Sequence, residues 1–176
     1  MNSSKPDKAS RWYGASIRVR YQETDRMGVV YHANYLTWFE TGRTEMFRQL
    51  GLTYRSMEEA GLLLPVIQAD LQFKSPARYD DHIAVYARLT TFSALRVVYE
   101  YEIRRVAEDG GEDGVSGSFL LRPENSQPLP GELLVSGATS HVWLNREWKP
   151  VRIDRAQPEL FRAILAALNE EEGGAV

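Results

Sequence analysis

Residues 21–51 have the sequence YQETDRMGVVYHANYLTWFETGRTEMFRQLG, and this stretch decides the fold. Its first part, residues 22–33, contains Gly28 and is expected to form a loop. Its second part starts at Asn34, a residue type that often caps helix N-termini, and ends at Gly51, a residue type that often terminates helices. The stretch therefore predicts a loop that is followed directly by one long helix.

The predicted helix has an apolar stripe along one side. Its apolar residues recur at steps of three or four, which is the spacing of one helix face. The stripe consists of Tyr35, Trp38, Phe39, Gly42, Met46, Phe47 and Leu50. Such a wide stripe predicts a deeply buried helix. Gly42 lowers helix propensity by about 1 kcal/mol relative to alanine, so we expect a neighbouring element to pack closely against it.

The rest of the chain contains segments in which apolar and polar residues alternate, the pattern of half-buried strands. One precedes the loop and four follow the helix, at residues 16–21, 67–73, 83–89, 97–103 and 133–144. Shorter helices are expected at 53–60 and 158–168. Consecutive strands with short links pair antiparallel. The order of elements therefore predicts an α+β fold, with the long helix against one face of an antiparallel sheet.

A chain of 176 residues is long enough for one domain with a substantial core and short for two. We expect a single domain over residues 15–168, with a flexible N-terminal tail at 1–14 and a C-terminal tail at 169–176. Residues 110–131 are rich in Gly, Pro, Ser and Asn, so we expect an insertion there that interrupts the sheet.

The composition argues against several classes of protein. The net charge is −3, whereas a nucleic-acid partner favours a basic face. There is no cysteine, and His32, His82 and His141 lack metal-ligand spacing, so no disulfide, thiolate nucleophile or metal site is expected. No apolar run approaches the roughly 20 residues of a membrane-spanning helix, and the polar N-terminus lacks the apolar core of a signal peptide. We therefore expect a cytoplasmic protein without a cofactor.

One ordered set of residues precedes and opens the long helix. It consists of Asp25, Gly28, His32, Asn34 and Tyr35. This set resembles the 4-hydroxybenzoyl-CoA thioesterase family of hotdog-fold proteins, in particular its YbgC-like acyl-CoA thioesterase branch. The similarity covers residues 16–93 and 136–144. It implies a hotdog fold, in which an antiparallel sheet wraps around a long central helix. It also implies an acyl-CoA substrate and a homo-oligomer, a dimer or tetramer, with active sites at subunit interfaces.

The resemblance implies that Asp25 is the catalytic carboxylate, either as a nucleophile at the thioester carbonyl or as a general base for water. A thioester is activated enough for a carboxylate to act without a catalytic triad. The developing oxyanion needs fixed donors, and the helix that starts near Asn34 offers free backbone N–H groups and a positive dipole end. We therefore assign the oxyanion contact to the backbone N–H of His32 or a near neighbour. Gly28 would allow the loop to fold back toward the helix start.

Substrate contacts are expected from residues around Asp25 and from one arginine. The candidates near Asp25 are Tyr21, Gly28, Tyr31, Asn34 and Tyr35. The family often carries basic residues for the CoA phosphates in the turn that corresponds to residues 90–95, but this turn has none here. Arg96 is the nearest candidate, and Arg78, Arg104 and Arg105 are weaker ones.

Each assignment has a structural alternative. Asp25 could cap a turn without any chemical role, and the His32 side chain could either line the site or satisfy a local hydrogen bond. Tyr21 is expected mainly in the core. Glu40 lies three residues before Arg43, which favours an ion pair on the helix surface over the catalytic role that a different hotdog branch gives to a helix glutamate.

Two other functions compete with acyl-CoA hydrolysis. The first is hydrolysis of acyl groups on an acyl carrier protein, which would favour a basic docking patch that this acidic chain does not show. The second is a non-catalytic acyl-CoA binding module, in which Asp25 would be dispensable. A hotdog dehydratase would need paired Asp and His residues at a helix start, and this arrangement is not visible.

Overall fold

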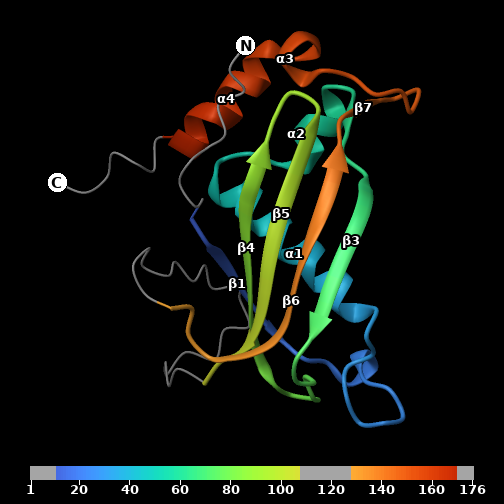
Figure 1. Cartoon of the computed structure of the whole chain (residues 1–176), viewed down its shortest axis with the longest axis vertical. Helices are drawn as coiled ribbons and strands as arrows, with labels where there is room; N and C mark the ends of the chain where they lie inside the picture. The colour runs from blue at the N-terminus through green and yellow to red at the C-terminus, as the bar shows by residue number, and fades with distance from the viewer. Residues whose placement is uncertain (1–10, 108–127, 170–176) are drawn as a thin grey trace, which may run out of the picture.

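A five-stranded antiparallel sheet forms the centre of the computed structural model, which describes residues 11–107 and 128–169. The strand order is β1-β4-β5-β6-β3 (Figure 1). The strands are β1 (Tyr13–Arg18), β3 (Val66–Phe73), β4 (His82–Phe92), β5 (Arg96–Arg105) and β6 (Glu132–Val142). A separate two-stranded sheet pairs β2 (Leu62–Leu63) with β7 (Leu144–Asn145). The α+β architecture predicted from the order of elements is confirmed.

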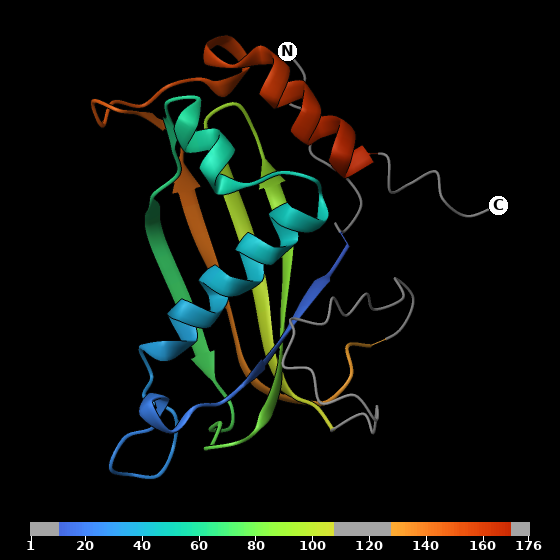
Figure 2. The same ribbon diagram turned by 180° about the vertical axis from the view of Figure 1, so that it is seen from behind.

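Helix α1 (Asn34–Gln49) lies across one face of the sheet, as Figure 2 shows. Six of the seven residues of its predicted apolar stripe are buried, and the seventh, Leu50, packs against the core as a partly buried residue. The other helical elements are η1 (Tyr21–Glu23), α2 (Tyr54–Glu59), α3 (Ile153–Ala156) and α4 (Pro158–Asn169). The long helix predicted for this region is therefore confirmed, with its apolar stripe against the sheet.

Two glycines allow α1 to approach the sheet closely. A Cβ atom on Gly42 would lie 2.8 Å from Val85 Cγ1, so the helix backbone sits directly over β4. A Cβ atom on Gly137 of β6 would lie 2.9 Å from the ring of Phe39. The Phe39 ring is stacked on Tyr101, with centroids 4.2 Å apart and planes at 7°. The close packing expected at Gly42 is thus confirmed, and the sheet has a matching glycine.

The pairing of consecutive strands differs from the prediction at β3 and β4. These strands follow one another in sequence, yet β3 pairs with β6 at the far edge of the sheet. The reason is that both edges of β4 are already occupied, one by β1 and the other by β5. Strand β3 therefore forms an edge of the sheet and hydrogen-bonds to β6 alone among the described strands.

The first strand also ends earlier than predicted. An alternating pattern suggested a strand through Tyr21, whereas β1 ends at Arg18 and Tyr21 begins the 3-10 turn η1. The Glu23 carboxylate accepts a hydrogen bond from the Arg20 backbone N–H at 2.8 Å, which closes this turn. Tyr21 is consequently 79% exposed and does not belong to the core, contrary to the expectation.

The expected insertion and tails lie largely outside the described residues. Of the insertion at 110–131, only residues 128–131 are described, and they lead into β6. Strand β1 begins at Tyr13 and α4 extends to Asn169, so the described elements reach slightly beyond the expected domain limits on both sides. None of the helices within 11–107 and 128–169 is long and apolar enough to cross a membrane.

Replacing Gly137 with alanine should destabilise the fold by about 1–3 kcal/mol, and more than replacing Gly42 with alanine. At Gly42 the new methyl meets the Val85 side chain, and the gain of about 1 kcal/mol in helix propensity offsets part of the cost. At Gly137 it overlaps the backbone carbonyl oxygen of Asp70, which belongs to the β3–β6 ladder and cannot move independently. Urea denaturation of both variants measures the losses, and equal losses would contradict this account.

Candidate active site

Residues 23–31 form a tight hairpin in front of α1. Thr24 and Val30 make an antiparallel bridge, and the Asp25 N–H donates to the Val29 carbonyl oxygen at 2.9 Å. The Gly28 N–H donates to the Asp25 carbonyl oxygen at 3.0 Å, which closes the turn. Gly28 has φ +74°, a left-handed conformation that favours glycine. The hairpin therefore presents Asp25 on one arm and leads into α1 from the other.

The Asp25 carboxylate uses one of its two oxygens within the loop. Oδ1 accepts the Met27 backbone N–H at 2.8 Å, which fixes the orientation of the side chain. Oδ2 has no hydrogen bond or ion pair with any residue in the described ranges. The side chain is half-buried. Asp25 thus caps its own turn, as the structural alternative held, and still keeps one oxygen available for chemistry.

The start of α1 offers backbone N–H groups without acceptors. The amides of His32 and Ala33 donate to no backbone or side-chain acceptor in the described part of the chain. The next amide, that of Asn34, donates to the Tyr31 carbonyl oxygen at 2.9 Å. The His32 side chain is exposed, with its ring 4.4 Å from that of Tyr31. The two open amides lie at the start of α1, where the helix polarity favours a negatively charged oxygen.

Asn34 does not cap the helix, contrary to the sequence prediction. The N-cap position is occupied by Ala33, and Asn34 is the first residue of α1. The Asn34 side-chain amide instead donates to the Glu23 carbonyl oxygen at 2.8 Å, and the Tyr31 N–H donates to the same oxygen at 2.9 Å. Because the Asn34 side chain is hydrogen-bonded to the hairpin, it does not cap the N-terminus of α1.

Glu23 is a functional candidate that the sequence analysis missed. It is a charged residue with 7% exposure, and its carboxylate accepts hydrogen bonds from two elements. The Trp38 indole N–H donates to Oε1 at 3.0 Å, and the Arg20 backbone N–H donates to Oε2 at 2.8 Å. Arg20 Nη2 lies 3.3 Å from Oε1. The only sequence signal was the spacing of three between Arg20 and Glu23, which is typical of a capping box.

The hydrogen bonds to Glu23 keep its carboxylate ionised. Burial by itself raises the pKa of Glu23. The hydrogen bonds from the Arg20 backbone, the Trp38 indole and the Arg20 guanidinium act in the opposite direction and outweigh it, so the pKa of Glu23 lies below its ordinary value of 4.5. The charged form of Glu23 therefore joins η1 to α1 at neutral pH.

The turn between β3 and β4 supports the hairpin from its other side. The Val30 N–H donates to the Ala77 carbonyl oxygen at 2.8 Å, and the Ala77 N–H donates to the Tyr35 hydroxyl at 3.1 Å. Tyr35 is buried, so its hydroxyl ties this turn to the first turn of α1. The hairpin is thus held by two different segments, through Glu23 and through Ala77.

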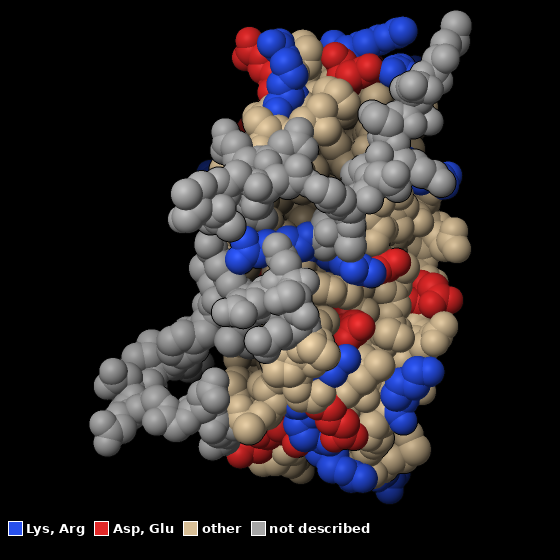
Figure 3. Space-filling view, turned by 60° about the vertical axis from the view of Figure 1, so that its left-hand side comes forward, with Lys and Arg blue, Asp and Glu red and all other residues tan. Residues whose placement is uncertain are grey.

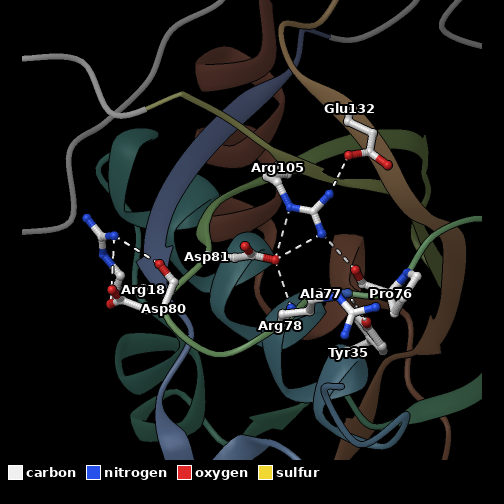
Figure 4. A network of polar contacts seen from close by, with 9 residues as sticks. All are labelled: Arg18, Tyr35, Pro76, Ala77, Arg78, Asp80, Asp81, Arg105 and Glu132. Carbon is white, nitrogen blue, oxygen red and sulfur yellow. Dashed lines mark hydrogen bonds and ion pairs between the residues drawn. The ribbon is translucent and has the colours of Figure 1, made fainter. Parts of the chain in front are cut away.

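The same turn is stabilised by Arg105, as the close-up in Figure 4 shows. Arg105 Nη2 donates to the Pro76 carbonyl oxygen at 2.8 Å and lies 3.0 Å from Asp81 Oδ2. Asp81 Oδ2 also accepts the Arg78 backbone N–H at 2.8 Å, and Glu132 of β6 pairs with the same guanidinium. Arg105 was considered as a weak candidate for binding CoA phosphate, but its guanidinium is engaged in this network.

Three candidate tyrosines occupy different environments. Tyr21 is at the surface, edge-on to the Tyr79 ring at 5.7 Å, and Tyr31 is 47% exposed. Tyr35 is buried, and its ring lies 5.7 Å from Phe73 at the end of β3. The exposed ring of Tyr31 is accessible to a ligand, whereas the ring of Tyr35 is packed inside the protein. Their roles in substrate binding stay predictions.

Arg96 lies at the opposite end of the sheet from Asp25 within one subunit. Strand β1 leads into the hairpin from Arg18, which pairs with His82 at the start of β4. Arg96 begins β5, beyond the far end of β4, where Phe92 pairs with Val97. An eleven-residue strand spans about 33 Å. Arg96 and Asp25 of one subunit are therefore separated by about the length of β4, and a role of Arg96 in substrate binding stays a prediction.

The arrangement defines a class of protein. A helix laid across an antiparallel sheet, with a half-buried carboxylate and open amides before the helix, fits acyl transfer without a metal, cysteine or serine nucleophile. The model of the thioesterase-like superfamily matches residues 19–122, more than half of the chain. The chain belongs to this superfamily, has the hotdog fold and is a thioester hydrolase.

Individual relatives agree with this assignment. YneP of Bacillus subtilis, whose name proposes acyl-CoA thioesterase activity, is 34% identical over 148 residues, 84% of this chain and 91% of YneP. The acyl-CoA thioester hydrolase YbgC of Escherichia coli O6:H1 is 31% identical over 93 residues, 53% of this chain and 67% of YbgC. A crystal structure of the DHNA-CoA thioesterase from Staphylococcus aureus has a TM-score of 0.72 and 31% identity, and the match covers 94% of this chain and 96% of that one.

Replacing Glu23 with glutamine should destabilise the protein by about 1–3 kcal/mol at pH 7, because an amide cannot accept all the hydrogen bonds that the carboxylate accepts. The pKa of Glu23 is lower in the folded state than its ordinary value of 4.5. The charge of Glu23 therefore stabilises the fold fully above pH 4.5, and this stabilisation is lost as the pH falls below 4.5 through the folded-state pKa. Chemical denaturation from pH 3 to pH 8 should show the difference between wild type and variant shrinking below pH 4.5. A pH-independent difference would exclude this electrostatic role.

Proposed function

We propose that the protein hydrolyses acyl-CoA thioesters, with Asp25 as nucleophile or general base. The observation that carries the proposal is the available Oδ2 of Asp25, on a hairpin that leads directly into the open amides of His32 and Ala33. The names of YneP, YbgC and the Staphylococcus aureus enzyme support a CoA thioester as the substrate.

In the proposed reaction the thioester carbonyl oxygen accepts a hydrogen bond from the His32 backbone N–H. The free oxygen of Asp25 either attacks the carbonyl carbon or removes a proton from the water that does. The carbon–sulfur bond then breaks, and CoA leaves as the thiol. In the general-base route it takes the proton that Asp25 removed from water, and after direct attack its thiolate takes a proton from solvent water. An acyl-aspartate formed by direct attack would be hydrolysed by water. One fixed backbone donor to the oxyanion contributes roughly a hundred- to a thousandfold in rate.

The alternative of an acyl carrier protein as substrate predicts a basic docking surface. On the face drawn in Figure 3, the basic side chains are interspersed with acidic ones. Ion pairs elsewhere in the structure also engage basic side chains, such as Arg88 with Glu100 and Arg152 with Asp154. A mixed surface of this kind provides no continuous positive field for an acidic carrier protein. This face therefore favours free CoA thioesters.

We also propose that the protein is a homo-oligomer, built from dimers that pair through β3. The outer edge of β3 has no partner among the described strands, and such edges are usually covered in stable proteins. Exposed apolar residues lie at both ends of β3, Val66 and Ile67 at one end and Phe73 at the other. Antiparallel pairing of two β3 strands would bring Ile67 of one copy near Phe73 of the other, as a two-fold interface requires. Pairing of two such dimers would give the tetramer.

Asp25→Asn should reduce kcat by about a hundred- to ten-thousandfold, the range that general-base catalysis contributes. Asparagine retains the Oδ1 cap on Met27 but cannot act as a base or nucleophile. Affinity for acyl-CoA should change little, because the lost interaction belongs to the transition state. Release of free thiol from a panel of acyl-CoAs measures the rate, and calorimetry measures the affinity.

Asp154→Asn is the matched control, since Asp154 is a surface aspartate paired with Arg152. Its kcat should equal that of the wild type. Activity of Asp25→Asn within a few-fold of the wild type would leave Asp25 only its role as a turn cap. Binding of acyl-CoA by a wild type that hydrolyses none of the panel would favour the non-catalytic binding module.

Light scattering at micromolar concentration should give a mass of at least twice the 20.1 kDa of one chain. Replacing Ile67 with lysine should shift the distribution toward the monomer, because a charge on the strand edge opposes strand pairing. Lysine in place of the exposed Leu95, which lies away from β3, is the control. A monomeric wild type would remove the proposed interface.

A further inference from the structure

A cavity of about 330 Å³ lies further along α1 from the candidate active site. Its lining residues come from α1, from α2 and from the segment that contains β2. Its apolar lining comes mainly from Met57 and the three consecutive residues Leu62, Leu63 and Leu64. Arg43 also lines it. Glu40 and Glu58 line it as well. A pocket of this size, with apolar residues and a few charged groups, is typical of a binding site for a small organic group.

The Arg43 guanidinium lacks a closely bound carboxylate. Its side chain is only 14% exposed. The one carboxylate paired with it among the described residues is that of Glu40, with Oε2 3.9 Å from Nη2, beyond hydrogen-bonding distance. The Glu40 side chain is 68% exposed and points its charge largely to solvent. The guanidinium does hydrogen-bond the hydroxyl groups of Tyr54 and Tyr101. Because an arginine has five N–H donors and these two hydroxyls carry no charge, Arg43 keeps donors and an unneutralised charge for a ligand.

The groups beneath Arg43 are neutral at physiological pH. Burial lowers the pKa of His141 to about 4, and the charge of Arg43 lowers it further in the same direction. Burial raises the pKa of Tyr101 to about 12. Their side chains are linked through Thr139, at 2.8 Å on each side. Because these three side chains are uncharged, they do not neutralise the charge of Arg43.

The cavity lies along α1 from the helix start, into which the Asp25 hairpin leads. Arg43 follows Asn34 by nine residues, which corresponds to about 13.5 Å along the helix axis. Helical side chains lean toward the N-terminus, so the guanidinium lies nearer to the helix start than its own Cα atom. Leu36 is on the same flank of α1 as Glu40 and Arg43, and it is exposed between the helix start and the cavity.

We propose that this cavity binds the far end of the acyl group and that Arg43 selects acyl groups with a hydrogen-bond-accepting oxygen there. The proposal rests on the proposed acyl-CoA hydrolysis at Asp25. The apolar body of the acyl group passes Leu36 and lies against Leu62 and Leu64, and its terminal oxygen accepts hydrogen bonds from the guanidinium. Both a terminal carboxylate and a terminal hydroxyl have this chemistry. A carboxylate can bind the guanidinium through two parallel hydrogen bonds, and Glu40 is exposed enough to move aside.

The test compares three ten-carbon acyl groups, in decanoyl-CoA, 10-hydroxydecanoyl-CoA and decanedioyl-CoA, because a shorter chain would not reach from the helix start toward Arg43. Wild type should have a kcat/KM about tenfold to a hundredfold higher for at least one of the two oxygen-bearing substrates than for decanoyl-CoA, the range of a hydrogen bond to a charged group. Arg43→Met retains the apolar stem but removes the donors, and it should abolish this preference. Arg43→Lys keeps the charge and should retain part of it. The two oxygen-bearing substrates distinguish a carboxylate from a hydroxyl.

The outcomes separate this proposal from the proposed function. Failure of wild type to hydrolyse any of the three, or any other acyl-CoA of the panel, would overturn the proposed function. Hydrolysis of all three substrates at equal kcat/KM would overturn only the role of Arg43. An equal fall of kcat/KM for all three substrates in Arg43→Met would also overturn only that role. Should the Arg43 variants not fold, inhibition of wild type by the free acids decides the question. Decanedioate or 10-hydroxydecanoate should then inhibit at least tenfold more strongly than decanoate, and equal inhibition would overturn the proposal.

Discussion

The close contact of α1 with the sheet is the constraint on which the rest of the structure depends. Gly42 on the helix and Gly137 on β6 leave no room for a side chain at these two crossings, and Phe39 fills the space above Gly137. Dense packing of this kind does not slide, because any shift would open a void on one side and an overlap on the other. The contact therefore determines where the first turn of α1 lies relative to β4 and β6, and with it the position of the open amides.

The hairpin with Asp25 receives its position from this helix through two polar connections. Glu23 joins it to the indole of Trp38, and Ala77 joins it to the hydroxyl of Tyr35. Both partners lie in the first turns of α1, so the carboxylate and the helix N-terminus move as one unit. Arg105 extends this support into the sheet. Preorganisation of this type allows charge to be stabilised in the transition state without reorganisation.

Much of the fold followed from local pattern, because helix and strand periodicities are properties of neighbouring residues. The boundaries of α1 and the close approach at Gly42 could be predicted in this way. The position of β3 in the sheet could not be predicted in this way, because strand order depends on which strand edges are free. The edge of β4 that does not face β5 is occupied by β1. Tyr21 continued the alternating pattern of the first strand, yet a turn closed by Glu23 carries it to the surface.

The sequence by itself determined the class of the protein and its principal candidate, Asp25, because the spacing of a short motif before a helix is a local property. Only the tertiary structure decided which residues support that carboxylate and which charges are buried. Glu23, Arg105 and Arg43 are ordinary charged residues in the sequence. Their significance comes from groups brought near them by packing, such as Trp38, and the electrostatic effect of burial exists only once the chain has folded.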